Sequence, residues 1–203
     1  MLTKYNQCKF TAFKALIAYQ LNWACFFTAF AMLLYLQIAK AEDTVKPSFF
    51  SHVKDTVSQT WASDKTELYI PINTWHNRNF YSAEEIDRFN ERPWGLGAGK
   101  YRYDEDGDWH GIYAFAFLDS HNDIEPIVGY GFQKVWCANE NLRFGVGYTA
   151  GVTLRGSIHY APLPVLAPLF SIKYKQVALQ STYILGGNGF GNILFSWLRV
   201  ELP

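Results

Sequence analysis

Cysteine is scarce in this chain of 203 residues, which contains only Cys8, Cys25 and Cys137. The first two lie in an N-terminal stretch that we expect to be removed, so one thiol remains. One thiol cannot form an internal disulfide, which excludes a small disulfide-stabilised scaffold. Packing, or contact with lipid, must therefore stabilise the fold.

An excess of charge of one sign is also missing. The chain has 18 Lys and Arg and 18 Asp and Glu, and removal of four lysines with the N-terminal stretch leaves 14 basic residues. No basic patch stands out, which argues against nucleic-acid binding.

No histidine pair and no acidic cluster has the spacing of metal ligands. We therefore predict neither a metal nor another cofactor.

Long apolar runs are rare, and the one at residues 21–36 lies near the N-terminus. Lysines precede it and Ala39-Lys40-Ala41 follows it, which is the pattern of a signal peptide with a cleavage site. A membrane anchor is the alternative, but the run is shorter than the ~20 residues that a spanning helix needs and contains Asn22. We therefore predict a signal peptide over residues 1–41 and export.

An amphipathic helix is predicted within residues 42–62. Pro47 suits its first turn. Its apolar stripe consists of Phe50, Val53, Val57 and Trp61. Such a stripe either packs on its own domain or lies at a membrane interface. We expect this helix on the periplasmic side.

Helical periodicity disappears in residues 63–203, where short alternating or apolar segments are bounded by turn residues. Strands are predicted at 67–72, 95–103, 109–118, 125–136, 142–154, 165–174, 177–184 and 192–202. About eight strands, an even number, indicate a small closed barrel. The predicted fold is all-β: an eight-stranded antiparallel transmembrane β-barrel with the N-terminal amphipathic helix.

The clearest alternation lies at residues 144–154, where one face is apolar and the other consists of glycine and threonine. In a soluble sandwich the second face would meet water and carry charges, but it carries none. The pattern is typical of lipid outside a barrel and a crowded lumen inside. A soluble lipid carrier of lipocalin-like shape, with the faces reversed, is the alternative.

The connections between the strands alternate in length, which places polar groups at particular ends of the barrel. Outer-membrane barrels have short turns in the periplasm and longer loops outside. The first and third strands both run outward, so His76, Asp119 and Ser120 are predicted to share the external rim. Histidine, acid and serine are the parts of a nucleophilic acyl-transfer site. Polar rim residues without a catalytic role are the alternative.

Three prolines, Pro162, Pro164 and Pro168, surround the start of the sixth predicted strand. Proline cannot donate to a β-ladder. They indicate either a loop that ends later than the predicted strand boundary or a break in the barrel wall through which a lipid tail passes.

Several motifs in one order and spacing resemble the PagP family, the lipid A palmitoyltransferases of the Gram-negative outer membrane. They are Leu68-Tyr69-Ile70-Pro71, Thr74-Trp75-His76, Asn90-Glu91-Arg92-Pro93-Trp94-Gly95, Trp109-His110-Gly111, Asp119-Ser120, Glu125-Pro126-Ile127, Thr149-Ala150-Gly151-Val152-Thr153 and Pro162-Leu163-Pro164-Val165-Leu166. The resemblance implies transfer of a palmitoyl chain from the sn-1 position of a glycerophospholipid to a hydroxyacyl chain of lipid A. It also implies catalytic roles for His76, Asp119 and Ser120, an external active site, and a monomer or weak homodimer.

Further roles follow from the same resemblance. Gly131 matches the floor of the acyl-chain pocket, where a larger side chain should shorten the acyl group that is selected. Pro168 matches a proline beside a lateral opening. Trp61 and Arg102 match residues that tie the helix to the barrel.

The chain departs from the family pattern at Leu185, where a proline beside a second opening is expected, and at Asn188, where a gating tyrosine is expected. His121 stands in place of a tryptophan. The alternative function is a non-enzymatic outer-membrane barrel that binds lipid or has a structural role. In that case replacing His76 would change only local packing.

Overall fold

The computed structural model describes residues 48–187 and 191–203. The predicted signal peptide, residues 1–41, lies outside the described residues, and so does Asn188. The helices α2 (Phe49–Trp61) and α3 (Ala83–Ile86) precede the second strand. Within the described ranges, no helix is long and apolar enough to cross a membrane.

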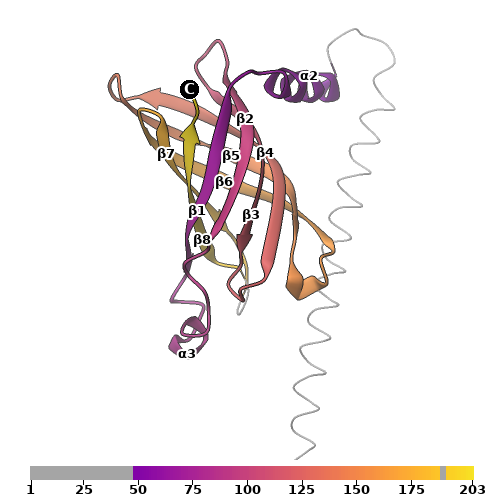
Figure 1. Ribbon diagram of the computed structural model, residues 1–203, viewed down its shortest axis with the longest axis vertical. Coiled ribbons are helices and arrows are strands. Elements are labelled where there is room, and N and C mark those ends of the chain that lie inside the picture. Colours follow the sequence, from indigo (N-terminus) through magenta and orange to yellow (C-terminus); the bar gives the residue numbers. More distant parts are fainter. Residues whose placement is uncertain (1–47, 188–190) are drawn as a thin grey trace, which may run out of the picture. The chain divides into compact units, whose positions relative to one another are not determined.

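Eight strands form one closed antiparallel barrel, in which each strand pairs with its sequence neighbours and β1 pairs with β8 (Figure 1). The strands are β1 (Thr66–His76), β2 (Gly95–Tyr103), β3 (Trp109–Leu118), β4 (Ile124–Cys137), β5 (Leu142–Leu154), β6 (Pro162–Tyr174), β7 (Val177–Ile184) and β8 (Ile193–Glu201). The predicted eight-stranded antiparallel barrel is confirmed.

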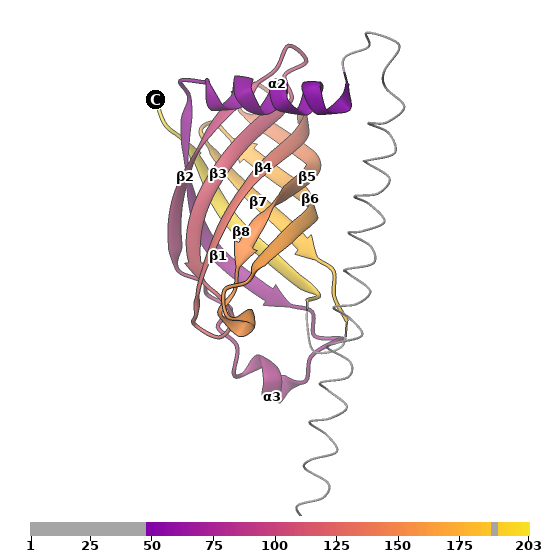
Figure 2. The same ribbon diagram turned by 90° about the vertical axis from the view of Figure 1, so that its right-hand side faces the viewer.

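The two ends of the barrel differ in the length of their connections. The short-turn end carries residues 104–108, 138–141 and 175–176. The long-loop end carries residues 77–94, 155–161, 185–187 and 191–192, together with 119–123, which is as short as 104–108. Figure 2 shows the long-loop end with α3 extending from it. The alternation predicted from the sequence is present.

β4 exceeds its predicted range by one residue at each end, and two other strands exceed theirs by more. β1 continues beyond Ile72 to His76, and β6 begins at Pro162 instead of residue 165. β6 tolerates its prolines because Pro162 to Pro168 pair with β5 on one side and lie outside the ladder to β7 on the other. The interpretation of this region as a longer loop is wrong.

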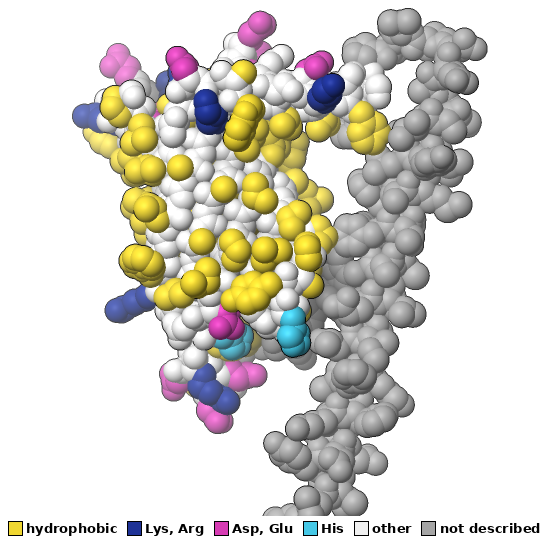
Figure 3. Space-filling view, turned by 45° about the vertical axis from the view of Figure 1, so that its right-hand side comes forward, with side chains coloured by type: hydrophobic (Ala, Val, Ile, Leu, Met, Phe, Trp, Pro, Cys, Tyr) yellow, Lys and Arg dark blue, Asp and Glu magenta, His cyan; other side chains and the backbone are white. Residues whose placement is uncertain are grey.

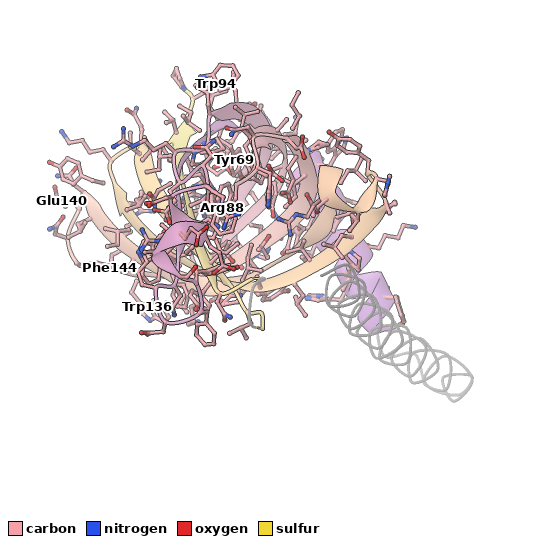
Figure 4. The ribbon with its side chains drawn as sticks, turned by 90° about the horizontal axis from the view of Figure 1, so that it is seen from below. Tyr69, Arg88, Trp94, Trp136, Glu140 and Phe144 are labelled. Carbon is pink, nitrogen blue, oxygen red and sulfur yellow. The ribbon has the colours of Figure 1, made fainter. Side chains whose placement is uncertain are left out.

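Large apolar side chains cover the outer face of the strands. On β5, Phe144, Val146, Tyr148 and Val152 are exposed, whereas Gly145, Thr149 and Thr153 are buried. Figure 3 shows hydrophobic side chains along the barrel wall and charged groups toward its two ends. Seen from the long-loop end, Trp94 and Trp136 point outward and Tyr69 lies within the ring of strands (Figure 4). This is the surface of a transmembrane barrel, not that of a soluble carrier.

Aromatic and charged side chains fill the interior. The aromatic cluster consists of Tyr69, Tyr101, Trp109, Tyr113, Phe115, Leu169, Phe195 and Trp197. Toward the short-turn end, Lys173 pairs with Glu201, and Arg199 Nη1 lies 3.5 Å from Glu67 Oε2. The guanidinium of Arg199 also lies 4.3 Å from the centre of the Trp109 ring. Inside the lumen these ion pairs link β8 to its neighbour β1 and to β6.

Candidate active site

A β-bulge in β1 determines the direction of the His76 side chain. Between Pro71 and Asn73 the register advances two residues along β1 but one residue along β8, so Ile72 is an extra residue. Before the bulge the odd-numbered Tyr69 is buried in the barrel, and after it the even-numbered His76 is buried. Because side chains alternate along a strand, His76 would face outward if Ile72 continued the regular alternation instead of forming the bulge.

The imidazole of His76 is contacted on both nitrogens. Its Nε2 lies 2.9 Å from Ser120 Oγ, and its Nδ1 lies 3.1 Å from Glu91 Oε1. The ring of Phe89 stacks on it at a centroid distance of 4.5 Å, and Tyr81 meets it edge-on at 5.2 Å. Loop residues thus enclose an imidazole that is 1% exposed.

The structure brings His76 and Ser120 together, but it does not bring Asp119 to the imidazole. Asp119 Oδ1 accepts hydrogen bonds from the backbone N–H groups of His121, at 2.8 Å, and Asp123, at 2.9 Å. This carboxylate closes the 119–123 turn in the manner of an Asx-turn. The Oδ2 atom is buried and has no hydrogen-bond partner among the described residues.

The carboxylate that contacts the imidazole of His76 belongs to Glu91, which the sequence analysis did not identify as a site residue. Its Oε1 also accepts from the backbone N–H of His76 at 3.0 Å. Arg78 donates hydrogen bonds to both oxygens of this carboxylate, and the one to Oε2 measures 2.7 Å. It also donates to the backbone carbonyl of His76 at 2.7 Å. These hydrogen bonds from Arg78 lower the pKa of Glu91 to about 2. Glu91 lay inside a recognised motif, but no spacing rule links it to a residue 15 positions away.

A cavity of about 120 Å³ begins beside Asp119 and Ser120 and runs into the barrel. On β3 its lining reaches Tyr113, on β5 Thr149, and on β8 Trp197. The hydroxyls of Tyr113 and Thr149 are hydrogen-bonded to each other at this inner limit. Most of the lining surface is apolar, as is usual for a site that takes an apolar chain, but Glu125, Arg155 and four threonines also line the cavity.

Gly131 lies deeper in the barrel than the residues that line the cavity. It pairs with Gly111, which precedes Tyr113 by two residues on β3 and so lies closer to the short-turn end. A Cβ atom at Gly131 would lie 2.8 Å from Trp109 Cζ3 and 3.3 Å from Leu169 Cδ2. The Trp109 ring therefore fills the space beside the residue that resemblance assigns to the pocket floor.

The barrel wall is interrupted beside the cavity. The β6–β7 ladder runs from Leu169 and Thr182 to the short-turn end, so Pro168 and the preceding residues of β6 lie outside it. Thr182 Oγ1 donates to the Pro168 carbonyl at 2.7 Å. Leu163 on β6 and Ile184 on β7 both line the cavity. The cavity thus meets the wall where pairing stops; nearby, Leu185 is 79% exposed.

Arg102 takes part in the expected contact between the helix and the barrel, but its partner is the residue next to Trp61 and not Trp61 itself. Arg102 Nε donates to Thr60 Oγ1 at 3.3 Å, whereas Trp61 is 65% exposed. Ser63 Oγ adds a bond to the Tyr101 carbonyl at 2.7 Å. The C-terminal end of α2 is therefore bonded to β2 directly.

Residues 56–199 match the family model for the antimicrobial peptide resistance and lipid A acylation protein PagP. The chain belongs to the PagP family. The match reaches from α2 into β8, so it includes every residue of the His76 site described above.

Individual PagP family proteins are similar over most of their length. One from Laribacter hongkongensis is 53% identical over 156 residues, 77% of this chain and 76% of that protein. One from Photorhabdus laumondii is 54% identical over 154 residues, 75% of this chain and 74% of that protein. One from Musicola paradisiaca is 48% identical over 170 residues, which cover 82% of this chain and 88% of that protein. Each of the three is named lipid A acyltransferase PagP.

Proposed function

We propose that this protein is an outer-membrane acyltransferase that transfers an acyl chain to lipid A. The observation that carries the proposal is the 2.9 Å contact between Ser120 Oγ and His76 Nε2 beside an apolar cavity. A hydroxyl next to an imidazole is the arrangement of an activated nucleophile. Membership of the PagP family and the names of the relatives support lipid A as the acceptor.

In the proposed reaction, His76 Nε2 accepts the proton of a hydroxyl group whose oxygen attacks the carbonyl carbon of the donor ester. This hydroxyl belongs to lipid A in a direct transfer, or to Ser120 in a transfer through an acyl-serine. In either route the bond from the acyl carbon to glycerol oxygen breaks, and His76 returns the proton to that oxygen. In the direct route this step forms the ester bond to lipid A. In the route through Ser120, the lipid A hydroxyl then attacks the acyl-serine and gives its proton to His76, the bond from the acyl carbon to Ser120 Oγ breaks, and His76 returns the proton to that oxygen. Asp119 belongs to the proposed catalytic site, where its Oδ2 is free to accept a hydrogen bond from a donor on the substrate other than the attacking hydroxyl.

The proposed donor is a glycerophospholipid with a palmitoyl chain at its sn-1 position. The largely apolar lining of the cavity suits such a chain, which enters it from the equally apolar interior of the bilayer without passing through water. The interruption between β6 and β7 provides access from the bilayer because the cavity lining includes residues of both strands. Gly131 and Pro168 belong to this donor site in the proposal, and Trp61 and Arg102 to the tie between α2 and the barrel.

The proposed topology follows from the lengths of the connections. Outer-membrane barrels expose their longer loops to the exterior, so the long-loop end with His76 and Ser120 faces outward and α2 lies on the periplasmic side. Residues 1–41 act as the signal peptide. The proposed assembly is a monomer or weak homodimer.

The proposal is tested by mass spectrometry of lipid A. Detergent-folded protein is incubated with lipid A and a phospholipid that carries a labelled palmitoyl chain. We expect a gain of one labelled acyl group, which His76→Ala and Ser120→Ala abolish and the exposed control His52→Ala on α2 retains. Label retained on Ser120 distinguishes the two-step route. No transfer by a folded wild-type barrel would support the lipid-binding or structural alternative.

A further inference from the structure

The loop of residues 77–94 supplies a carboxylate that the catalytic assignment does not include. Glu91 Oε1 lies 3.1 Å from His76 Nδ1, on the side of the ring opposite Ser120. The bidentate contact with Arg78 keeps the carboxylate ionised, and the pKa of Glu91 falls to about 2. An ionised carboxylate only accepts hydrogen bonds. Nδ1 must therefore be the donor in this contact.

This contact determines the state of the other nitrogen. In a neutral imidazole one nitrogen carries the hydrogen and the other has a free lone pair. With the hydrogen on Nδ1, the lone pair of Nε2 faces the Ser120 hydroxyl 2.9 Å away. The ring is then in the tautomer that can take a proton from a hydroxyl at this position.

We propose that Glu91 is the positioning residue of His76: it fixes the Nδ1–H tautomer and the ring orientation from the 77–94 loop. This inference rests on the proposed function. Arg78 supports this arrangement because its guanidinium contacts both the Glu91 carboxylate and the backbone carbonyl of His76. These contacts hold the three residues in place relative to one another. When His76 becomes an imidazolium during the reaction, the negative charge of Glu91 stabilises it.

Asp119 does not compete for this role. Its Oδ1 is occupied by two backbone N–H groups of its own turn. The imidazole of His121 lies beside it, with Nδ1 4.0 Å from Oδ2. The two carboxylates thus divide the work: Glu91 orients the base, and Asp119 lies at the cavity, where substrate binds.

Nitrogen-15 NMR of the imidazole rings tests this inference without depending on activity. The chain has five histidines, and the spectrum of His76→Ala identifies the resonances of His76. In the folded wild-type protein we expect the neutral ring in the Nδ1–H form. Glu91→Ala should shift the ring toward the Nε2–H form, whereas Asp119→Asn should leave the wild-type tautomer in place.

The same variants are compared in the acyl-transfer assay. We expect Glu91→Ala to lower kcat by about 10²–10⁴-fold, the usual size of a general-base contribution, with KM nearly unchanged. Glu91→Gln keeps an acceptor oxygen for Nδ1–H, so it should retain the tautomer and recover about tenfold of the lost rate. Glu84→Gln is the matched control, because Glu84 pairs with Arg88 on the same loop.

The outcomes separate the two proposals. An inactive wild-type protein overturns the proposed function. An active wild type, together with a Glu91→Ala variant that keeps both the Nδ1–H tautomer and the kcat of the control, overturns only the positioning role. If Glu91→Ala fails to fold, Glu91→Gln decides: its Nδ1 proton resonance must move upfield, because a neutral acceptor forms a weaker hydrogen bond. An unchanged resonance overturns the inference.

Discussion

Glu91 illustrates how a partly exposed side chain can keep its charge in acid. Arg78 donates to both of its oxygens, and the backbone N–H of His76 adds a third bond. The pKa of Glu91, about 2, lies below the ordinary value of 4.5 for a glutamate. Its ionisation therefore stabilises the folded state above the pKa of the unfolded chain, and this contribution disappears as the pH falls toward the folded pKa.

The first prediction concerns pH. The unfolding temperature of the wild type should exceed that of Glu91→Gln by a constant amount between about pH 7 and about pH 5. The difference should shrink below the ordinary pKa of 4.5 and vanish near the folded value of about 2. Thermal unfolding in detergent, followed by circular dichroism, measures both proteins. A difference that grows in acid would contradict this sign.

Gly131 gives a second prediction at the residue scale. Its Cβ would lie 2.8 Å from Trp109, so Gly131→Ala must displace the indole. We expect the preferred acyl chain to become shorter, with a loss of about fivefold or more for the longest chain, since overpacking a filled interior costs roughly 1–3 kcal/mol. Lipid A is analysed by mass spectrometry after incubation with phospholipids of mixed chain length.

The control for this experiment is Ala114→Val on the outer face of β3. It adds volume to the same barrel without touching the Trp109 ring, so the chain-length profile should stay as in the wild type. A profile that Gly131→Ala leaves unchanged would mean that the donor chain does not reach this depth.

Sequence reasoning located some residues of the site and missed others for a physical reason. The direction of the strands predicted that His76 and Ser120 share one end, and they do lie 2.9 Å apart. Glu91 was missed because its position depends on the path of an 18-residue connection, 77–94, between β1 and β2. Strand periodicity contains no information about how such a loop folds back.

At the scale of elements, the bulge in β1 matters more than any single contact. It reverses the facing of the residues that follow Ile72, so the lumen receives Tyr69 before it and His76 after it. The sequence could not reveal it, because Ile72 is an ordinary strand residue that fits either face. The boundaries of β2, β3, β5 and β7 were predictable because turn residues bound them clearly.

The third prediction tests the bulge. Deleting Ile72 should restore a regular register in which His76 still faces the lumen opposite Ile193, whereas inserting one alanine between Asn73 and Thr74 should turn His76 toward the lipid, since one residue moves every following side chain to the other face. We expect both variants to form a folded barrel, with acyl transfer retained in the deletion variant and as low as in His76→Ala in the insertion variant. Heat-modifiable migration on gels checks folding, and the lipid A assay checks transfer. Ile72→Ala keeps the extra residue and should remain active; activity in the insertion variant would refute this account.

At the scale of the whole molecule, the outer face decides where the protein resides. Exposed apolar residues lie on neighbouring strands around the wall, among them Val128, Val146, Phe170 and Leu179. A contiguous apolar surface of this kind marks contact with a membrane. The distribution of apolar and small residues in the sequence predicted this surface, because period-two alternation specifies the two faces of a strand directly.

The fourth prediction concerns membrane attachment. The protein should stay in the membrane fraction after extraction with carbonate or high salt and should leave it only in detergent. Phe170→Lys, which places a charge on the lipid face of β6, should reduce barrel stability by about 2–4 kcal/mol near the bilayer midplane and less toward its edges. Urea unfolding in lipid vesicles measures the difference. Extraction by carbonate alone would exclude an integral barrel.

The filling of the lumen has a consequence for electrical insulation. Aromatic rings and the Lys173–Glu201 and Arg199–Glu67 ion pairs occupy the interior. A barrel filled in this way differs from a porin, whose lumen is an aqueous channel. Copies of this barrel can therefore accumulate in a bilayer without raising its conductance.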